Sequence, residues 1–66
     1  MIIHVNGEAR EVTASRTVAE LVAELQLPAP AILVEHNGVA LHRSEWDTQT
    51  IAEGDRFEIL RVVAGG

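Results

Sequence analysis

The hydrophobic residues of this chain change their spacing twice, and these two changes restrict the fold more than any other feature. Residues 2–5 form a run typical of a strand, and residues 10–13 form a second short one. A stripe at i, i+3, i+4 and i+7, which predicts an α-helix, is made by Val18, Leu21, Val22 and Leu25. Strand patterns return in residues 31–36, 39–41 and 56–63. The sequence therefore predicts an α+β order.

Two Asn-Gly pairs mark tight turns between neighbouring strands. Asn6-Gly7 separates the first two runs, and Asn37-Gly38 separates the two runs that follow the helix. Asn-Gly suits a two-residue hairpin turn because both positions take a positive φ. Residues 42–50 lack a clear period and predict a short helical turn with a loop. Residues 53–55 predict a turn before the last strand.

Both ends of the predicted helix carry their own signals. Thr17 followed by Glu20 fits a capping box, in which a hydroxyl and a carboxylate bond the first free N–H groups. Pro28 and Pro30 cannot continue a helix, so the pattern predicts that it ends near Leu27.

A hairpin, a helix across its face and two or three more strands form a layered α+β domain. In the compact arrangement the first and last strands lie parallel at the centre of the sheet, which suits their aliphatic content. This is a ubiquitin-like β-grasp, a mixed sheet of four to five strands with one main helix. We expect residues 1–63 to form the domain and residues 64–66 a flexible C-terminal tail. The pattern alone leaves other small α+β orders open.

Composition limits what such a domain can do. A core of 66 residues without cysteine has no disulfide to support it, so the aliphatic residues must supply the stability. The net charge of −5 disfavours nucleic acid and anionic membranes, and it favours basic protein surfaces as partners. We expect a cytoplasmic chain, because no membrane span and no signal peptide is readable.

Catalytic and metal-binding patterns are weak throughout. The three histidines, His4, His36 and His42, have no zinc-like spacing and no cysteine beside them. Two acidic pairs in loop regions are interpreted as solvated charge: Glu45/Asp47 and Glu53/Asp55. Trp46 is expected to cover one edge of the core. The sequence thus predicts a protein that is not an enzyme and that binds no metal or cofactor.

The sequence closes with Ala64, Gly65 and Gly66 after the last strand pattern. Glycines lack a Cβ and can enter a channel too narrow for other residues. The carboxylate of Gly66 could therefore be delivered into the active site of another enzyme, joined to AMP, and attacked by a sulfur donor to give a thiocarboxylate. The alternative is a frayed terminus without a role.

The last strand predicts a docking surface beside this tail. If Phe57 and Ile59 face the core, strict alternation places Leu60 and Val62 on the other face. With Ile2 from the first strand they would form an apolar patch for a partner. Val63 and Ala64 would continue this contact toward the tail. A bulge that turns these side chains inward is the alternative.

The chain resembles the bacterial thiamin-biosynthesis sulfur carrier proteins over nearly its whole length. The matching segments are Asn6-Gly7, residues 17–21, Asn37-Gly38, residues 43–46, residues 53–55 and residues 63–66. The resemblance implies that an E1-like enzyme uses ATP to adenylate Gly66. Sulfur derived from cysteine through a desulfurase then converts Gly66 to a thiocarboxylate, which passes the sulfur to thiazole synthase. It also implies a chain that is monomeric when free.

Four other functions remain open. One is the small subunit of a molybdopterin synthase, which uses the same terminal chemistry. A second is a sulfur carrier for tRNA thiolation or cysteine synthesis. A third is a ubiquitin-like modifier that joins its terminus to lysines of target proteins. The fourth is an interaction module with an inert tail.

Overall fold

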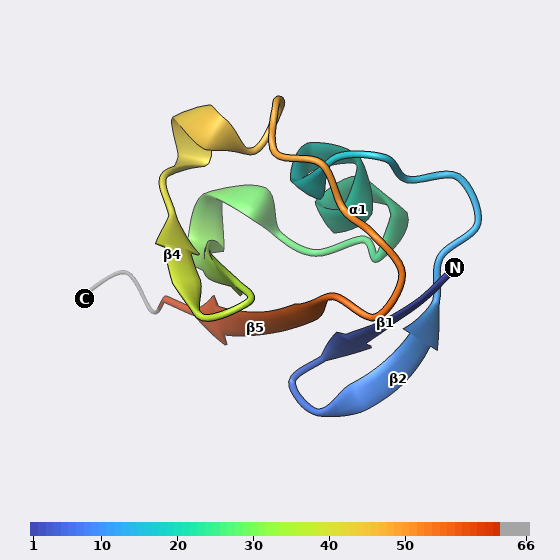
Figure 1. The fold of residues 1–66 in the computed structure, drawn as a ribbon. Coiled ribbons are helices and arrows are strands. Elements are labelled where there is room, and N and C mark those ends of the chain that lie inside the picture. The colour runs from blue at the N-terminus through green and yellow to red at the C-terminus, as the bar shows by residue number, and fades with distance from the viewer. Residues whose placement is uncertain (63–66) are drawn as a thin grey trace.

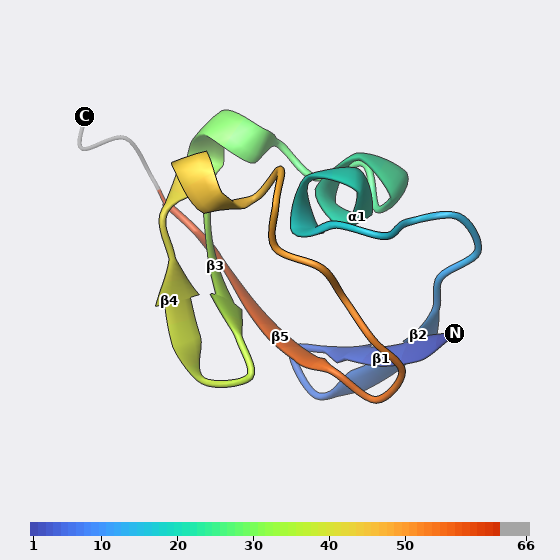
Figure 2. The same cartoon turned by 45° about the horizontal axis from the view of Figure 1, so that its top comes forward.

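The computed structural model describes residues 1–62 of the chain. A single five-stranded mixed sheet has the order β2-β1-β5-β3-β4. Helix α1 and two short 3₁₀ helices, η1 and η2, lie on one side of this sheet (Figures 1 and 2). The elements are β1 Ile2–Val5, β2 Glu8–Glu11, α1 Val18–Glu24, η1 Ala29–Ala31, β3 Ile32–His36, β4 Val39–Leu41, η2 Arg43–Glu45 and β5 Arg56–Arg61.

Strand β5 is the last strand of the chain and the central strand of the sheet. It pairs in parallel with β1, where Val5 lies opposite Phe57, and antiparallel with β3 along its whole length. The predicted parallel pair of first and last strands is therefore confirmed, and so is the β-grasp. The sheet has five strands, the upper end of the predicted range.

Both predicted hairpins are present, but the second strand begins earlier than expected. Asn6 and Gly7 take φ values of 51° and 83°, so a two-residue turn brings Val5 directly opposite Glu8. The prediction of a strand at residues 10–13 was thus shifted by two residues. Val12 lies beyond the end of β2, where it is buried and its N–H donates to the carbonyl of Met1.

The capping box at the start of α1 is confirmed. The Thr17 hydroxyl accepts from the Glu20 N–H at 3.2 Å, and the Glu20 carboxylate accepts from the Thr17 N–H at 3.2 Å. The helix ends at Glu24, earlier than the predicted Leu27. Gln26 takes a left-handed φ of 56° and starts a Schellman turn, in which the Leu27 N–H donates to the carbonyl of Val22. The chain therefore leaves the helix before the prolines.

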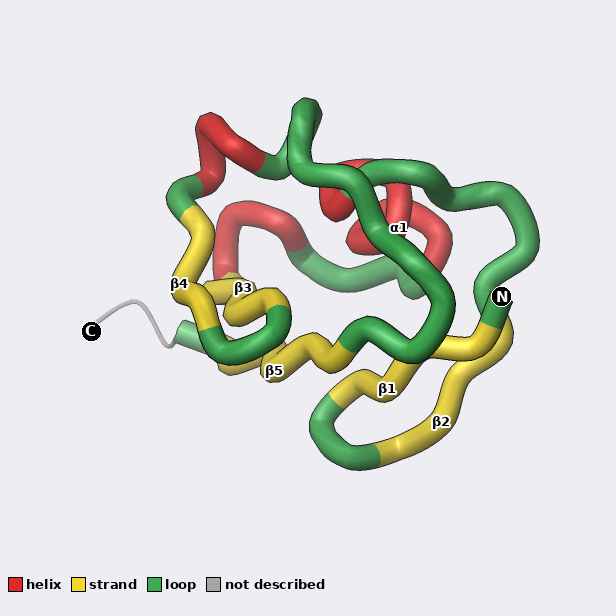
Figure 3. Tube along the Cα trace, viewed as in Figure 1, coloured by secondary structure: helices red, strands yellow, loops and turns green. Residues whose placement is uncertain are grey.

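The core lies between α1 and one face of the sheet. Its most deeply buried side chains include Phe57, Ile3 and Leu21. Trp46 is buried against the same cluster, which confirms its predicted place at the edge of the core. The Trp46 carbonyl also accepts from the N–H of Ala19, so the loop after η2 is attached to the first turn of the helix. This loop runs beside α1 before it enters β5 (Figure 3).

A polar cluster fastens the end of that loop to the sheet. The buried ring of His36 stacks on Phe57 at 4.6 Å, and its Nε2 lies 2.7 Å from Oδ2 of Asp55. Asp55 also accepts from the N–H of Ala52 and from the side chain of Asn37. The interpretation of Asp55 as solvated loop charge was wrong, because the register that places residue 55 beside His36 cannot be seen in the local sequence.

Two other loop carboxylates also hold backbone groups. Glu53 accepts from the N–H of Ile2 at 2.9 Å, and Glu45 accepts from the N–H of His42 at 2.8 Å. These acids are exposed, yet each satisfies an N–H group that the strand or turn would otherwise leave to water. Their interpretation as solvated charge was therefore incomplete.

Replacing Gln26 by glycine should stabilise the domain. The left-handed conformation is unfavourable for a residue with a Cβ, so Gln26→Gly is expected to raise the free energy of unfolding by about 0.5–1 kcal/mol. The melting temperature should rise by a few degrees, measured from the fluorescence of Trp46, the one tryptophan of the chain. Gln26→Ala keeps the Cβ and is the matched control; an equal gain in that variant would contradict this explanation.

The Asp55 cluster should make stability depend on pH. Burial alone raises the pKa of Asp55, but hydrogen bonds from His36, Ala52 and Asn37 outweigh it and leave the pKa below its ordinary value. A lowered folded-state pKa gives stability that is present above the unfolded pKa and is lost as the pH falls through the folded one. The contribution should therefore fade below about pH 5.

Two variants test this assignment by thermal unfolding across a pH series. Asp55→Ala should lower the free energy of unfolding at neutral pH by about 1–3 kcal/mol, and its difference from wild type should shrink on acidification. Asp47→Asn changes an exposed aspartate whose side chain makes no hydrogen bond within residues 1–62, and it should unfold like wild type at neutral pH. A constant difference at all pH values would show that the Asp55 charge is irrelevant.

Candidate functional site

The candidate site begins where β5 ends. Arg61 is the last residue of the strand, two residues short of the predicted end at Val63. The N–H of Val62 still donates to the carbonyl of Ala31 at 2.6 Å, so β3 and η1 hold the chain up to this point. The predicted site residues Val63, Ala64, Gly65 and Gly66 lie outside the described residues.

The two faces of β5 differ as the alternation predicts. Phe57 is 1% exposed and points to the helix side of the sheet. Leu60 is 52% exposed and Val62 is 44% exposed, on the face that no other described element covers. No bulge turns them inward. Of the two arrangements that the sequence leaves open for Leu60 and Val62, the structure has the exposed one.

The apolar neighbour of Leu60 is a different residue from the one expected. Because β1 runs parallel to β5, Ile2 lies near Gly54, at the far end of the strand from Leu60. Placing Ile2 in the patch was wrong for this reason. Leu33 of β3 lies directly opposite Leu60 instead, and it is 55% exposed. We use the term apolar patch for Leu33, Leu60 and Val62.

Sequence reasoning missed Leu33, although one signal was present. Strict alternation through residues 32–36 places Leu33 and Glu35 on the face opposite to Ile32 and Val34. That pattern marks Leu33 as a large apolar residue on a solvent face. Its position beside Leu60 depends on the register between β3 and β5, which the local sequence does not encode.

An acidic row borders the apolar patch. Glu35 and Glu58 lie directly opposite each other on β3 and β5, one step along from Leu33 and Leu60 on the same face. Like charges in this position destabilise a sheet. Among residues 1–62, one contact between oppositely charged residue types is present, and it joins His36 to Asp55. Arg56, two residues from Glu58, therefore forms no ion pair with either glutamate.

The described part of the chain has few means for chemistry of its own. Within residues 1–62, no group of three or more histidines, aspartates and glutamates is arranged to hold a metal ion. No helix in that range combines the length and the apolar character needed to cross a membrane. What the site offers is a firmly anchored strand end, an exposed apolar patch and an acidic border.

The sheet order, the single helix over one face and the central C-terminal strand define a small ubiquitin-like β-grasp domain. A crystal structure of a thiamine biosynthesis protein (ThiS) from Geobacter metallireducens has this fold, with a TM-score of 0.86, 35% identity and full coverage of both chains. A family model described as the ThiS family matches residues 3–66. The chain therefore belongs to the ThiS family.

Two curated proteins extend the comparison. The sulfur carrier protein ThiS of Escherichia coli strain K12 is 29% identical over 66 residues, and the match covers both chains completely. A thiazole synthase of Paramagnetospirillum magneticum is 33% identical over the same length. The chain spans 20% of that protein's length, so its counterpart there is one segment of a larger protein.

Proposed function

We propose that this chain is the sulfur carrier of thiamin thiazole biosynthesis and that its reactive group is the carboxylate of Gly66. The observation that carries the proposal is the match of the ThiS family to residues 3–66, which includes Gly65 and Gly66. The exposed apolar patch at the end of β5 supports it. Four residues follow Val62, and an extended chain of that length reaches about 13 Å.

The chemistry needs two steps at Gly66. A carboxylate oxygen attacks the α-phosphorus of ATP, pyrophosphate leaves, and an acyl-adenylate forms. Hydrosulfide, or a sulfur donor at the same oxidation level, then attacks the acyl carbon and displaces AMP, which leaves a thiocarboxylate. The carrier binds no cofactor in this scheme, because ATP is bound by the adenylating enzyme.

The apolar patch is the proposed docking surface, continued by Val63 and Ala64. A partner that covers Leu60 and Val62 removes exposed apolar area from water. A basic rim on that partner would neutralise the opposed Glu35 and Glu58. We therefore expect complementary surfaces with an apolar centre and a basic border on the enzymes that handle the tail.

Three partners follow from this scheme. An E1-like enzyme adenylates the tail. A cysteine desulfurase supplies the sulfur as a persulfide, which a thiol reductant must reduce by two electrons to release hydrosulfide. Thiazole synthase accepts the sulfur, which is supported by thiazole synthases that contain a segment similar to this chain. Since the scheme consumes ATP, we place the carrier in the cytoplasm, where ATP is made and used.

Intact-mass measurement tests the reactive group. After incubation with ATP, an E1-like adenylating enzyme and inorganic sulfide, the chain should have one oxygen replaced by sulfur, located on Gly66 by fragmentation. A chain without Gly66 should unfold at the same temperature as wild type and should gain no sulfur. Sulfur on an internal residue, or normal thiolation of the shortened chain, would refute the proposal.

The same reaction separates the alternative functions. Transfer of sulfur to a thiazole synthase but not to the large subunit of a molybdopterin synthase would exclude the molybdenum pathway. Isopeptide-linked adducts in cells would favour a modifier instead. The native protein must also end at Gly66, which its intact mass from cell extract will show.

Docking is tested separately by Leu60→Asp. The substitution should leave the chain folded but lower the free energy of unfolding by about 1 kcal/mol, because it removes the contact with Leu33 and adds a carboxylate beside Glu35 and Glu58. It should weaken binding to the adenylating enzyme about tenfold or more, because a carboxylate would then be buried in an apolar contact. Val39→Asp, on edge strand β4 and 61% exposed, is the matched control and should bind normally. Unchanged binding by Leu60→Asp would remove the patch from the interface.

A further inference from the structure

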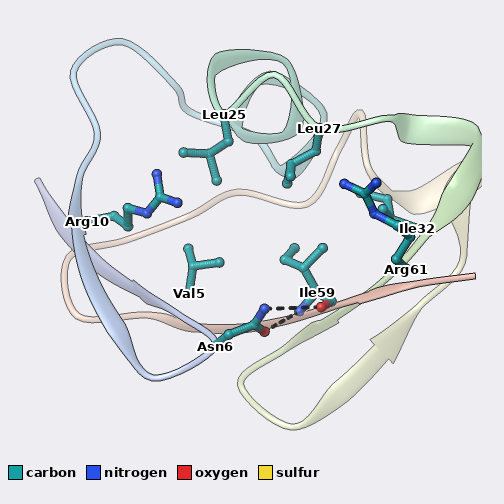
Figure 4. A pocket seen from close by; sticks show the side chains of 8 residues that line it. All are labelled: Val5, Asn6, Arg10, Leu25, Leu27, Ile32, Ile59 and Arg61. Carbon is teal, nitrogen blue, oxygen red and sulfur yellow. Dashed lines mark hydrogen bonds between the residues drawn. The ribbon is translucent and has the colours of Figure 1, made fainter.

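A groove opens on the helix side of the sheet, away from the apolar patch. Its walls are Leu25 and Leu27 after α1 and Val5 and Ile59 from the sheet, with Arg10 and Arg61 at its two ends (Figure 4). The groove holds about 200 Å³. Sites for drug-sized ligands usually begin near 300 Å³, so this space suits one or two side chains rather than a whole cofactor.

The floor of the groove is fixed by the side chain of Asn6. Strand β1 ends at Val5, and the Asn6 amide then continues the pairing in place of a strand. Its Oδ1 accepts from the Ile59 N–H at 2.7 Å, and its Nδ2 donates to the Ile59 carbonyl at 3.2 Å. These hydrogen bonds fix the floor of the groove before any partner arrives.

Beyond Asn6, strand β5 has an open edge. The Val62 N–H donates to the carbonyl of Ala31, and the Arg56 carbonyl accepts from the N–H of Asn37, so the backbone groups of residues 56 and 62 point toward β3. By alternation, the N–H and C=O groups of Phe57, Ile59 and Arg61 point to the other side of β5. There β1 pairs with Phe57, and the Asn6 side chain bonds Ile59. For Arg61, the described chain supplies no hydrogen-bond partner on that side.

The charge of the groove is opposite to that of the chain. The net charge is −5, yet Arg10 and Arg61 line the groove and no carboxylate does. Neither guanidinium forms an ion pair within residues 1–62. Glu8 lies on the same face of the hairpin as Arg10, since it pairs with Val5. Within residues 1–62, the groove thus joins an aliphatic floor, two arginines without an ion pair and one strand edge that is open at Arg61.

We propose that this groove binds an extended, acidic and aliphatic segment of a partner protein. The segment lies extended in the groove, and at one end it bonds the open backbone groups of Arg61. Every second side chain of an extended segment faces the same way, so an aliphatic residue sits between Leu25, Leu27 and Ile59 with an acidic residue on either side. The carboxylates reach Arg10 and Arg61. This interaction uses the side of β5 opposite to the apolar patch and does not depend on sulfur chemistry.

The test uses a designed peptide and NMR of the ¹⁵N-labelled full chain. The probe is Asp-Thr-Leu-Thr-Asp, acetylated and amidated so that its ends carry no charge. Amide signals of Ile59, Arg61, Arg10 and Leu27 should shift saturably, with a dissociation constant of about 1 mM or tighter. Replacing the central leucine by serine should weaken binding about tenfold, and replacing both aspartates by lysine should weaken it at least as much.

Variants of the chain identify the cations. Arg10→Gln and Arg61→Gln should each weaken peptide binding about threefold, and Glu8→Gln should strengthen it. Arg56→Gln removes the same charge from the other face of β5 and should bind like wild type. Equal binding of all three peptides, or shifts confined to Leu33, Glu35 and Ala40, would overturn the proposal. Concentration-dependent shifts at the groove without peptide would also overturn it, since a second copy of the chain would then be the occupant.

Discussion

The insertion of β5 between β1 and β3 holds the whole domain together. Phe57 enters the core from this strand, stacks on His36, and joins elements that are more than fifty residues apart in sequence. A 66-residue domain without disulfides has little stability to spare, so the pairing on both sides of β5 has to be made well. The Asn6 side chain illustrates this requirement, because it prolongs the β1–β5 contact after β1 itself has ended.

This constraint also bears on the proposed reactive group at Gly66, which follows β5 in the sequence. A tail that follows an edge strand would leave from a part of the sheet that frays easily. Here the tail follows the central strand, and Val62 is still bonded to Ala31. The proposed docking surface and Val62 are therefore held by the same pairing of β5 with β3 and η1. A partner that binds the apolar patch can find the start of the tail at a fixed position, which lowers the conformational entropy lost in binding.

The sequence predicts the parts of this structure that depend on neighbouring residues. The Asn-Gly turns and the Thr17–Glu20 capping box each need only a few consecutive positions. The helix end was missed because Gln26 takes a conformation usually given to glycine, and the prolines gave a later and more visible signal. Alternation in β5 places Leu60 on the exposed face, as observed, but the position of Leu33 beside it depends on the register between β3 and β5. The partners of Asp55 and the groove depend on contacts between distant segments, which no local pattern contains.

The uncovered face of the sheet is poorly suited to a chain that works alone. Leu33 and Leu60 expose apolar area side by side, and Glu35 and Glu58 oppose each other in the next row. Both features disfavour the free domain, by lost burial in one row and by repulsion in the other. A partner with an apolar centre and a basic border would relieve both at once. Because these unfavourable features destabilise the free domain, relieving them makes partner binding more favourable. The marginal stability of so small a domain limits how many such features it can carry.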